Sequence, residues 1–385
     1  MTALQPPLSL YVHLPWCVRK CPYCDFNSHK AGDAAPRSRY IKALSADLTK
    51  ECSRSANREI VSVFLGGGTP SLFSPEEIGE ILGPALSGFR LAPDCEITME
   101  ANPGTIEHGR LVDYRRAGVT RLSIGAQSFS ARSLQALGRI HGVEEIHSAY
   151  REATEAGFES VNIDLMFGLP GQNLARAKAD VEALLALSPP HVSYYQLTLE
   201  PNTVFFASPP ADLPDNDLCF EIQETCHDLL RKAGYGQYEI SAFARDGHEC
   251  RHNNNYWRFG DYLAAGAGAH GKLTDEDGSV WRYRKPANPL AFMEQAGTES
   301  LSDEDQLVSV EDLRFEFLLN ALRLHGGFSA QEFTDRTGLS FAVIGDDLAT
   351  AARTGLISCD GNEIWRPTEL GFRYLNDLQA HFLPG

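Results

Sequence analysis

The sequence has no long hydrophobic run and no surplus of positive charge. No segment approaches the roughly 20 apolar residues that a membrane-spanning helix needs, and residues 1–16 lack the basic and apolar regions of a secretory leader. We therefore expect no transmembrane segment and a cytoplasmic location. The net charge of −17 repels phosphate backbones and basic residues do not cluster, so nucleic acid is not an expected partner.

Cysteine is too sparse and too scattered for a disulfide scaffold. Nine cysteines stand in 385 residues, the count is odd, and thiols stay reduced in the cytosol. Six are interpreted as small, partly buried hydrophobic side chains: Cys52, Cys95, Cys219, Cys226, Cys250 and Cys359. The other three, Cys17, Cys21 and Cys24, lie within eight residues and need another explanation.

The spacing C-x3-C-x2-C puts three potential thiolate ligands on one short loop. Three thiolates can hold a [4Fe-4S] cluster and leave one iron open, and radical S-adenosylmethionine (SAM) proteins use this spacing with an aromatic residue before the last cysteine. A structural zinc site takes four protein ligands, and none follows at zinc-finger spacing, although His13 and His29 flank the loop. The spacing favours a cluster, with zinc or an inert loop as alternatives.

Short runs rich in β-branched and aromatic residues alternate with amphipathic helical patterns. Helical spacing is clearest in residues 39–52, 75–86 and 174–187. The alternation predicts a parallel sheet and most of a (β/α) barrel, with an open doubly wound sheet as the alternative. The expected strands with their closing turns are residues 8–15, 60–70, 95–104, 120–129, 160–172 and 191–201.

Residues suited to binding follow each expected strand, where parallel α/β folds place their sites. The cysteine loop follows the first strand and a glycine run ends the second. Such glycines allow a ligand to approach the backbone, and the alternative is a tight turn. The candidates at the strand ends are Gly66, Gly67, Gly68, Thr69, Pro70, Glu100, Gln127, Asp164, Gln196 and Glu200.

Six motifs resemble a radical SAM family that contains oxygen-independent coproporphyrinogen III oxidases and haem chaperones. The resemblance covers nearly the whole chain and implies a partial (β/α)6 radical SAM barrel. It also implies that Cys17, Cys21 and Cys24 bind the cluster and that the SAM amine and carboxylate complete the fourth iron. The motifs are YVHLPWCVRKCPYCDFNSH, FLGGGTPS, MEANPGT, RLSIGAQSF, LGRIHG and NIDLMFGLPGQ.

The same resemblance implies a set of SAM contacts, although each polar residue taken singly is also an ordinary loop residue. The segment FGLPGQ is interpreted as a turn that orders Asp164. The implied SAM-binding residues are Tyr11, Tyr23, Gly67, Gly68, Thr69, Glu100, Gln127, Arg139 and Asp164.

Two departures favour the haem chaperone branch. The oxidase branch has a fourth cysteine two residues beyond the third, where this chain has Phe26, and it has a longer N-terminal region than the ten residues before Tyr11. We therefore expect a protein that binds haem and transfers it to an unidentified acceptor protein. The alternative is a coproporphyrinogen III oxidase.

A second motif supports the chaperone branch. His252, Tyr256 and Trp257 match the H-N-x-x-Y-W element associated with haem in that branch. Histidine is a strong iron ligand, tyrosine ligates as phenolate, and aromatic rings suit the face of a macrocycle. The alternative is that His252 makes a structural hydrogen bond and the two aromatic residues pack in the core; His270 is a less favoured ligand.

The chain is expected to divide into three parts. Residues 1–210 form the barrel core, residues 211–297 carry the haem motif, and residues 298–385 form a small winged-helix-like α+β domain with a strand pair around Asp360. The acidic stretch 297–312 is the expected linker. Residues 301–385 hold 14 acidic and 6 basic side chains, so we expect a lid or partner contact there and not DNA binding.

Overall fold

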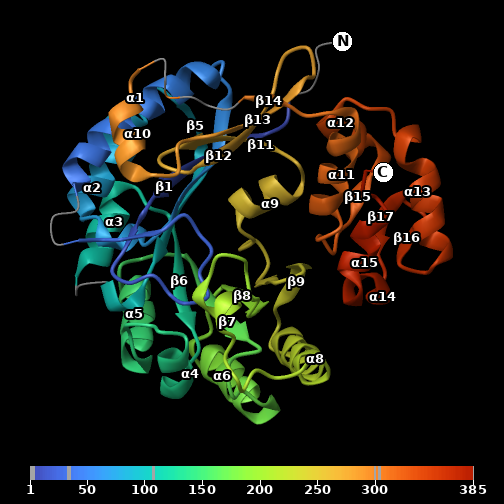
Figure 1. The fold of residues 1–385 in the computed structure, drawn as a ribbon, viewed down its shortest axis with the longest axis horizontal. Coiled ribbons are helices and arrows are strands. Elements are labelled where there is room, and N and C mark those ends of the chain that lie inside the picture. The colour runs from blue at the N-terminus through green and yellow to red at the C-terminus, as the bar shows by residue number, and fades with distance from the viewer. Residues whose placement is uncertain (1–4, 33–35, 106–108, 299–300, 302–304, 385) are drawn as a thin grey trace.

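Twelve strands form one curved sheet (Figure 1). This computed structural model describes residues 5–32, 36–105, 109–298, 301 and 305–384. The central strands are parallel and adjacent in chain order, which confirms the predicted partial barrel. They are β1 (Leu8–Leu14), β4 (Glu59–Gly67), β5 (Arg90–Ala101), β6 (Arg121–Gln127), β7 (Ser160–Phe167) and β8 (His191–Gln196).

Helices cover the outer face of these strands (Figure 1). In α1, Tyr40, Leu44 and Leu48 recur at helical spacing and are buried in the core that also contains Leu10 and Leu65 of the strands. The helices of the barrel region are α1 (Arg37–Arg54), α2 (Pro75–Glu80), α3 (Arg110–Ala117), α4 (Ala131–Ala136), α5 (Val143–Glu155), α6 (Leu174–Leu187), α7 (Val204–Ala207) and α8 (Asn216–Lys232).

Alternation along the strands separates an apolar outer face from a polar interior. On β7, Ile163 and Leu165 enter the hydrophobic core, whereas Asn162 and Asp164 line a cavity. The interior of the barrel therefore holds a cavity lined in part by polar side chains and is not a packed core.

Residues beyond the first 210 extend the same sheet at both of its ends. Strand β11 pairs in parallel with β1, and β12 to β14 continue the sheet beyond it in antiparallel pairing. The elements of this part are β9 (Gly236–Glu239), β10 (Ala242–Ala244), α9 (Arg251–Trp257), β11 (Asp261–Ala265), β12 (His270–Thr274), β13 (Val280–Arg284), α10 (Pro289–Gln295) and β14 (Gln306–Leu307).

The C-terminal segment forms a small domain with its own antiparallel sheet, in the strand order β15-β17-β16. Its core contains an aromatic cluster, in which Phe328 and Phe333 both pack edge-on against Phe317. The expected strand pair is present as β16 and β17. The elements are α11 (Val310–Ala321), β15 (Phe328–Ser329), α12 (Ala330–Thr337), α13 (Ala342–Arg353), β16 (Ile357–Cys359), β17 (Ile364–Pro367), α14 (Glu369–Arg373) and α15 (Leu375–Ala380).

Two expectations for the C-terminal part need adjustment. Cys359 is exposed rather than partly buried, because it ends the edge strand β16. The expected linker 297–312 lies partly outside the described residues, and it includes strand β14 and the start of α11. None of the described helices combines the length and apolar character that a membrane-spanning segment requires.

Candidate functional site

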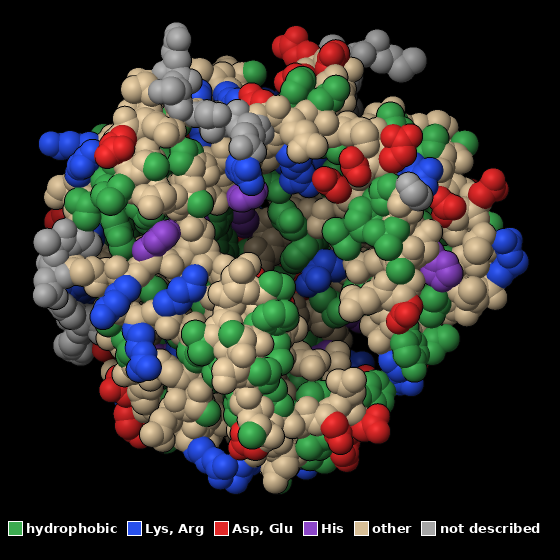
Figure 2. All heavy atoms as spheres, in the orientation of Figure 1, with side chains coloured by type: hydrophobic (Ala, Val, Ile, Leu, Met, Phe, Trp, Pro, Cys, Tyr) green, Lys and Arg blue, Asp and Glu red, His purple; other side chains and the backbone are tan. Residues whose placement is uncertain are grey.

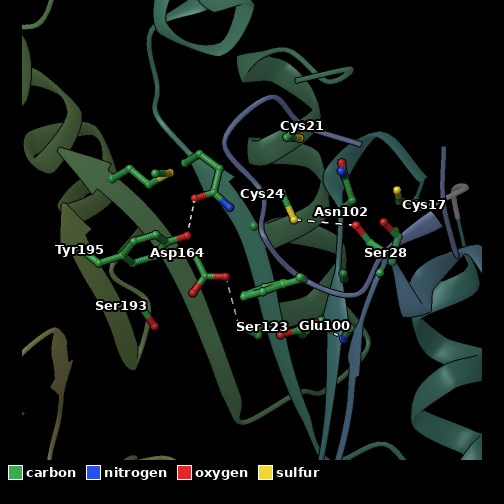
Figure 3. Close-up of a pocket in the computed structure, with 18 of the residues that line it drawn as sticks. Cys17, Cys21, Cys24, Ser28, Glu100, Asn102, Ser123, Asp164, Ser193 and Tyr195 are labelled. Atoms are coloured by element: carbon green, nitrogen blue, oxygen red, sulfur yellow. Dashed lines mark hydrogen bonds between the residues drawn. The ribbon is translucent and has the colours of Figure 1, made fainter. Parts of the chain in front are cut away.

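A cavity of about 500 Å³ runs from the cysteine loop into the barrel, within the size range of a site for one small ligand. Its walls include Glu100, Gln127 and Asp164, which the sequence predicted at three different strand ends. Figure 3 shows the labelled cysteines above this space, with Asp164 and Tyr195 pointing into it. The face drawn in Figure 2 is hollowed near its centre, where Figure 1 places α9 and β8.

The cysteine loop is held in place by short secondary structure and by one side chain. Strand β2 (Trp16–Cys17) pairs with β3 (His29–Lys30), which brings the two ends of the loop together. The Asn27 side-chain amide donates to the carbonyl oxygens of Ala267 and Ala287, each at 2.9 Å. The cysteine loop is thereby fixed to the loops that follow β11 and β13.

All three clustered thiols line the cavity. Arg139 Nη1 lies 3.6 Å from Cys21 Sγ, so a guanidinium supports negative charge on one sulfur. Among the described residues, no three His, Cys, Asp or Glu side chains are placed to hold a single metal ion. Three soft sulfur ligands around one open mouth suit an iron–sulfur cluster.

The flanking histidines do not complete a zinc shell in this arrangement. His13 Nδ1 lies 3.0 Å from the Tyr11 hydroxyl and His13 Nε2 lies 2.8 Å from the Asn27 carbonyl oxygen, so both ring nitrogens are engaged. His29 Nε2 lies 3.2 Å from Asn27 Oδ1. The donor set therefore fits a three-cysteine cluster better than a four-ligand zinc site.

The glycine run allows close packing of the backbone as well as approach to the cavity. A Cβ on Gly67 would lie 2.4 Å from the His13 ring, and one on Gly68 would lie 2.5 Å from the Trp16 carbonyl oxygen. Gly67 also has φ +112°, where a side chain is strained. Both glycines and Thr69 line the cavity. The glycine run therefore forms a tight turn and also exposes its backbone to the cavity.

Two acidic side chains lie inside the barrel without a salt bridge in the described structure. Glu100 accepts a hydrogen bond from Gly67 N at 3.1 Å, and Asp164 accepts one from Asn162 Nδ2 at 2.7 Å. Burial, with a smaller contribution from Asp164, raises the pKa of Glu100 to about 7. Burial also raises the pKa of Asp164. This wall is suited to ammonium or hydroxyl groups of a ligand.

Glu100→Gln is expected to stabilise the ligand-free protein at pH 8. The folded-state pKa of Glu100 is raised to about 7, so folding favours the neutral carboxyl group. Its contribution to stability is fully present below the pKa of the unfolded state and is lost as the pH rises through about 7. A permanently neutral amide avoids that loss, and the expected gain at pH 8 is about 3 kcal/mol.

Thermal unfolding measured from pH 5 to 8 tests this expectation. The gain should shrink towards pH 5, where the parent carboxyl group is itself neutral. Glu159→Gln, at an exposed position, is the matched control and should leave the pH dependence unchanged. Equal destabilisation by Glu100→Gln at both ends of the range would contradict the assignment.

Two predicted SAM contacts differ in their position. Tyr23 lines the cavity, whereas Tyr11 is not among the residues of its wall. The Tyr11 ring stacks on Phe64 with 6.3 Å between ring centroids. Tyr11 therefore supports the wall from behind in this structure, and its direct contact with SAM stays a prediction.

Sequence reasoning missed several polar residues in the lower part of the cavity. Ser123 and Ser193 belong to a hydrogen-bonded network with Asn162 and Asp164, and Tyr195 donates to Gln127 Oε1 at 2.7 Å. Each stands on the inward face of its strand. Polar residues at every second position of expected strands were the signal that would have identified them.

The predicted haem motif forms helix α9, which lies against the inner side of the barrel wall. The His252 ring packs on Phe64 with 5.0 Å between centroids, and His252 Nδ1 lies 3.3 Å from Ser62 Oγ. Burial lowers the pKa of His252 to about 3, so the imidazole is neutral. His270 stands exposed at the start of β12.

Of the other two residues of the motif, Trp257 contacts the C-terminal domain, and Tyr256 packs on Tyr262 of β11. Trp257 packs edge-on against Tyr256, with 4.8 Å between ring centroids. The Arg323 guanidinium lies 4.2 Å from the centre of the Trp257 ring. The structure therefore matches the packing alternative for these residues, and their role in haem binding stays a prediction.

The barrel with three cysteines at its mouth defines a radical SAM protein. Residues 11–184 match the Radical SAM superfamily, and residues 308–374 match the HemN C-terminal domain. Coproporphyrinogen III oxidase (HemN) from Escherichia coli has the same fold, with a TM-score of 0.83 and 23% identity over 98% of this chain and 90% of that one.

Two relatives define the family more closely. The protein named heme chaperone HemW from Escherichia coli (strain K12) is 48% identical over 98% of both chains. Heme chaperone HemW from Bacillus subtilis (strain 168) is 32% identical over 91% of this chain and 92% of its own. The chain belongs to the HemW family.

Proposed function

We propose that this protein is a haem chaperone of the cytoplasm, which binds haem and transfers it to an acceptor protein. The observation that carries the proposal is the cysteine loop, where three thiols line the cavity and Phe26 stands at the position of the oxidase's fourth cysteine. Full-length similarity to proteins named heme chaperone supports it. Similarity to the oxidase structure supports the fold alone.

In this proposal Cys17, Cys21 and Cys24 hold a [4Fe-4S] cluster, and the cavity below it binds SAM. A cluster bound there would offer SAM an open iron site. Glu100, Gln127, Arg139 and Asp164 bind and orient the SAM molecule, together with Tyr23 and the glycine run. Because the cavity of about 500 Å³ suits one small ligand, haem binds elsewhere on the molecule.

The haem site of the proposal is helix α9, with His252 as iron ligand and Tyr256 and Trp257 against the macrocycle. His252 packs on Phe64 and Tyr11 and is partly exposed. A separation of α9 from β1 and β4 would open its ring further to haem iron. Residues 1–210 would then hold the cluster and SAM, residues 211–297 the haem, and the acidic residues 298–385 would contact the acceptor.

Haem transfer and coproporphyrinogen oxidation separate the proposal from its alternative. Anaerobic incubation of the cluster-loaded protein with SAM, a reductant and coproporphyrinogen III should yield no protoporphyrinogen, because the fourth-cysteine position is Phe26. The same preparation should bind haem and pass it to an apo-haem protein. This transfer should be faster than the uptake of free haem by the same apo-haem protein. Repeated turnover of coproporphyrinogen would favour the oxidase.

A further inference from the structure

Gln127 has a backbone conformation that is uncommon for a residue with a side chain. Its φ is +71°, and the pairing of β6 with β7 shifts register between Ile124 and Gln127. Positive φ in a residue other than glycine persists where the surroundings enforce it, and a bulge at a strand end re-aims a side chain. Here the Gln127 side chain lines the cavity and accepts a hydrogen bond from the Tyr195 hydroxyl.

The residues that follow Gln127 are held by a carboxylate from the outer helical layer. Asp180, on α6, accepts hydrogen bonds from Ser128 Oγ at 2.8 Å and from Phe129 N at 2.7 Å. Its Oδ2 also lies 3.4 Å from Gln172 Nε2. One side chain thus joins the turn after β6 to the turn after β7, the two segments that appear in the sequence as AQSF and GLPGQ.

Burial of the Asp180 carboxylate costs free energy that packing alone does not offset. It is 4% exposed, and among the described residues no lysine, arginine or histidine pairs with it. Burial raises the pKa of Asp180 to about 6, and only neutral donors compensate for the lost hydration. An apolar residue would fill the same space at lower cost, so the carboxylate is retained for the hydrogen bonds that it accepts.

We infer that Asp180 is a positioning residue for SAM binding, which acts by fixing the strained Gln127 backbone at the cavity wall. The inference rests on the proposed function for the identity of the ligand. It assigns no contact between Asp180 and SAM. The effect passes through Ser128 and Phe129 to Gln127, whose amide then stands in a fixed place beside Tyr195.

A double-mutant cycle on SAM affinity tests the inference in full-length, cluster-loaded protein under anaerobic conditions. Asp180→Asn keeps the size of the side chain but changes its acceptors, and Gln127→Gly keeps the positive φ but removes the amide. Each change should weaken SAM binding about tenfold, and the double variant should be about as weak as either one, because both act through one group. The matched control is Glu182→Gln, an exposed acid on the same helix.

Independent effects would overturn the inference, as would unchanged affinity in Asp180→Asn. If Asp180→Asn does not fold, Ser128→Ala removes one hydrogen bond to the carboxylate, and parental SAM affinity in that folded variant would equally overturn it. The affinity of the parent is measured first: a parent that binds SAM but transfers no haem refutes the chaperone proposal and leaves this inference standing. A parent that does not bind SAM refutes both the cofactor assignment and the inference.

Discussion

Alanine at Cys17, Cys21 or Cys24 is expected to abolish the [4Fe-4S] cluster after anaerobic reconstitution. The three thiols line one mouth, and two remaining thiolates do not retain a cluster whose fourth iron already lacks a protein ligand. The effect should be near-complete in each single variant. Iron and acid-labile sulfide per chain, together with the visible absorption of the cluster, measure it.

A fourth cysteine in the same cavity provides a demanding control. Cys250 also lines the cavity, but its Sγ lies 3.6 Å from Glu96 Oε1 and burial raises its pKa to about 12. Cys250 is therefore a neutral thiol, and Cys250→Ala should keep full iron and sulfide. Cys359→Ala, at an exposed position, should do the same. Full cluster content in any of the three ligand variants would refute the assignment.

Most of the barrel could be predicted because each strand carries its own local signal. The runs around Val63, Ile124 and Ile163 are β-branched, and glycine, proline or polar residues end each of them. Parallel strands in chain order then place their ends on one side of the sheet. The sequence therefore predicted that Glu100 and Asp164 share one site.

The extension of the sheet beyond β1 could not be predicted in the same way. Strand β11 pairs with β1 across most of the chain, for example Leu10 with Leu263, and no local pattern encodes a partner at that distance. The role of Asp180 was hidden for a related reason. An acidic residue in an amphipathic helix is predicted to face solvent. Only the fold shows that Asp180 faces the turns after β6 and β7.

Helix α9 is fixed at both ends, which limits how its histidine can become available. Near its start, Arg251 Nη1 lies 2.6 Å from Asp94 Oδ2 on β5. Just after its end, Arg258 Nη1 lies 2.9 Å from Glu332 Oε1 in the C-terminal domain, and Phe259 is buried in the core of that domain. A displacement of the C-terminal domain would thus pull on the end of α9 while its start stays bound to β5.

His252→Ala is expected to weaken haem binding at least about tenfold and to shift the Soret band, because loss of an axial ligand changes the coordination of the iron. The cluster content should stay at the parental level. Trp257→Ala should have a smaller effect, since aromatic contact with the macrocycle contributes about 1 kcal/mol. Haem titration of folded, cluster-loaded protein, followed by absorption, measures both.

Ser62→Ala separates ligation from packing. Ser62 Oγ lies 3.3 Å from His252 Nδ1 and 2.7 Å from Ser9 Oγ, so its loss should lower thermal stability while the imidazole remains. A ligand role predicts a parental haem spectrum in Ser62→Ala and a changed one in His252→Ala. If both variants bind haem as the parent does and only their thermal stability is lower, α9 is a structural bridge between the barrel and the C-terminal domain. The exposed His270 then becomes the iron ligand to test, because it needs no movement of α9 to reach haem.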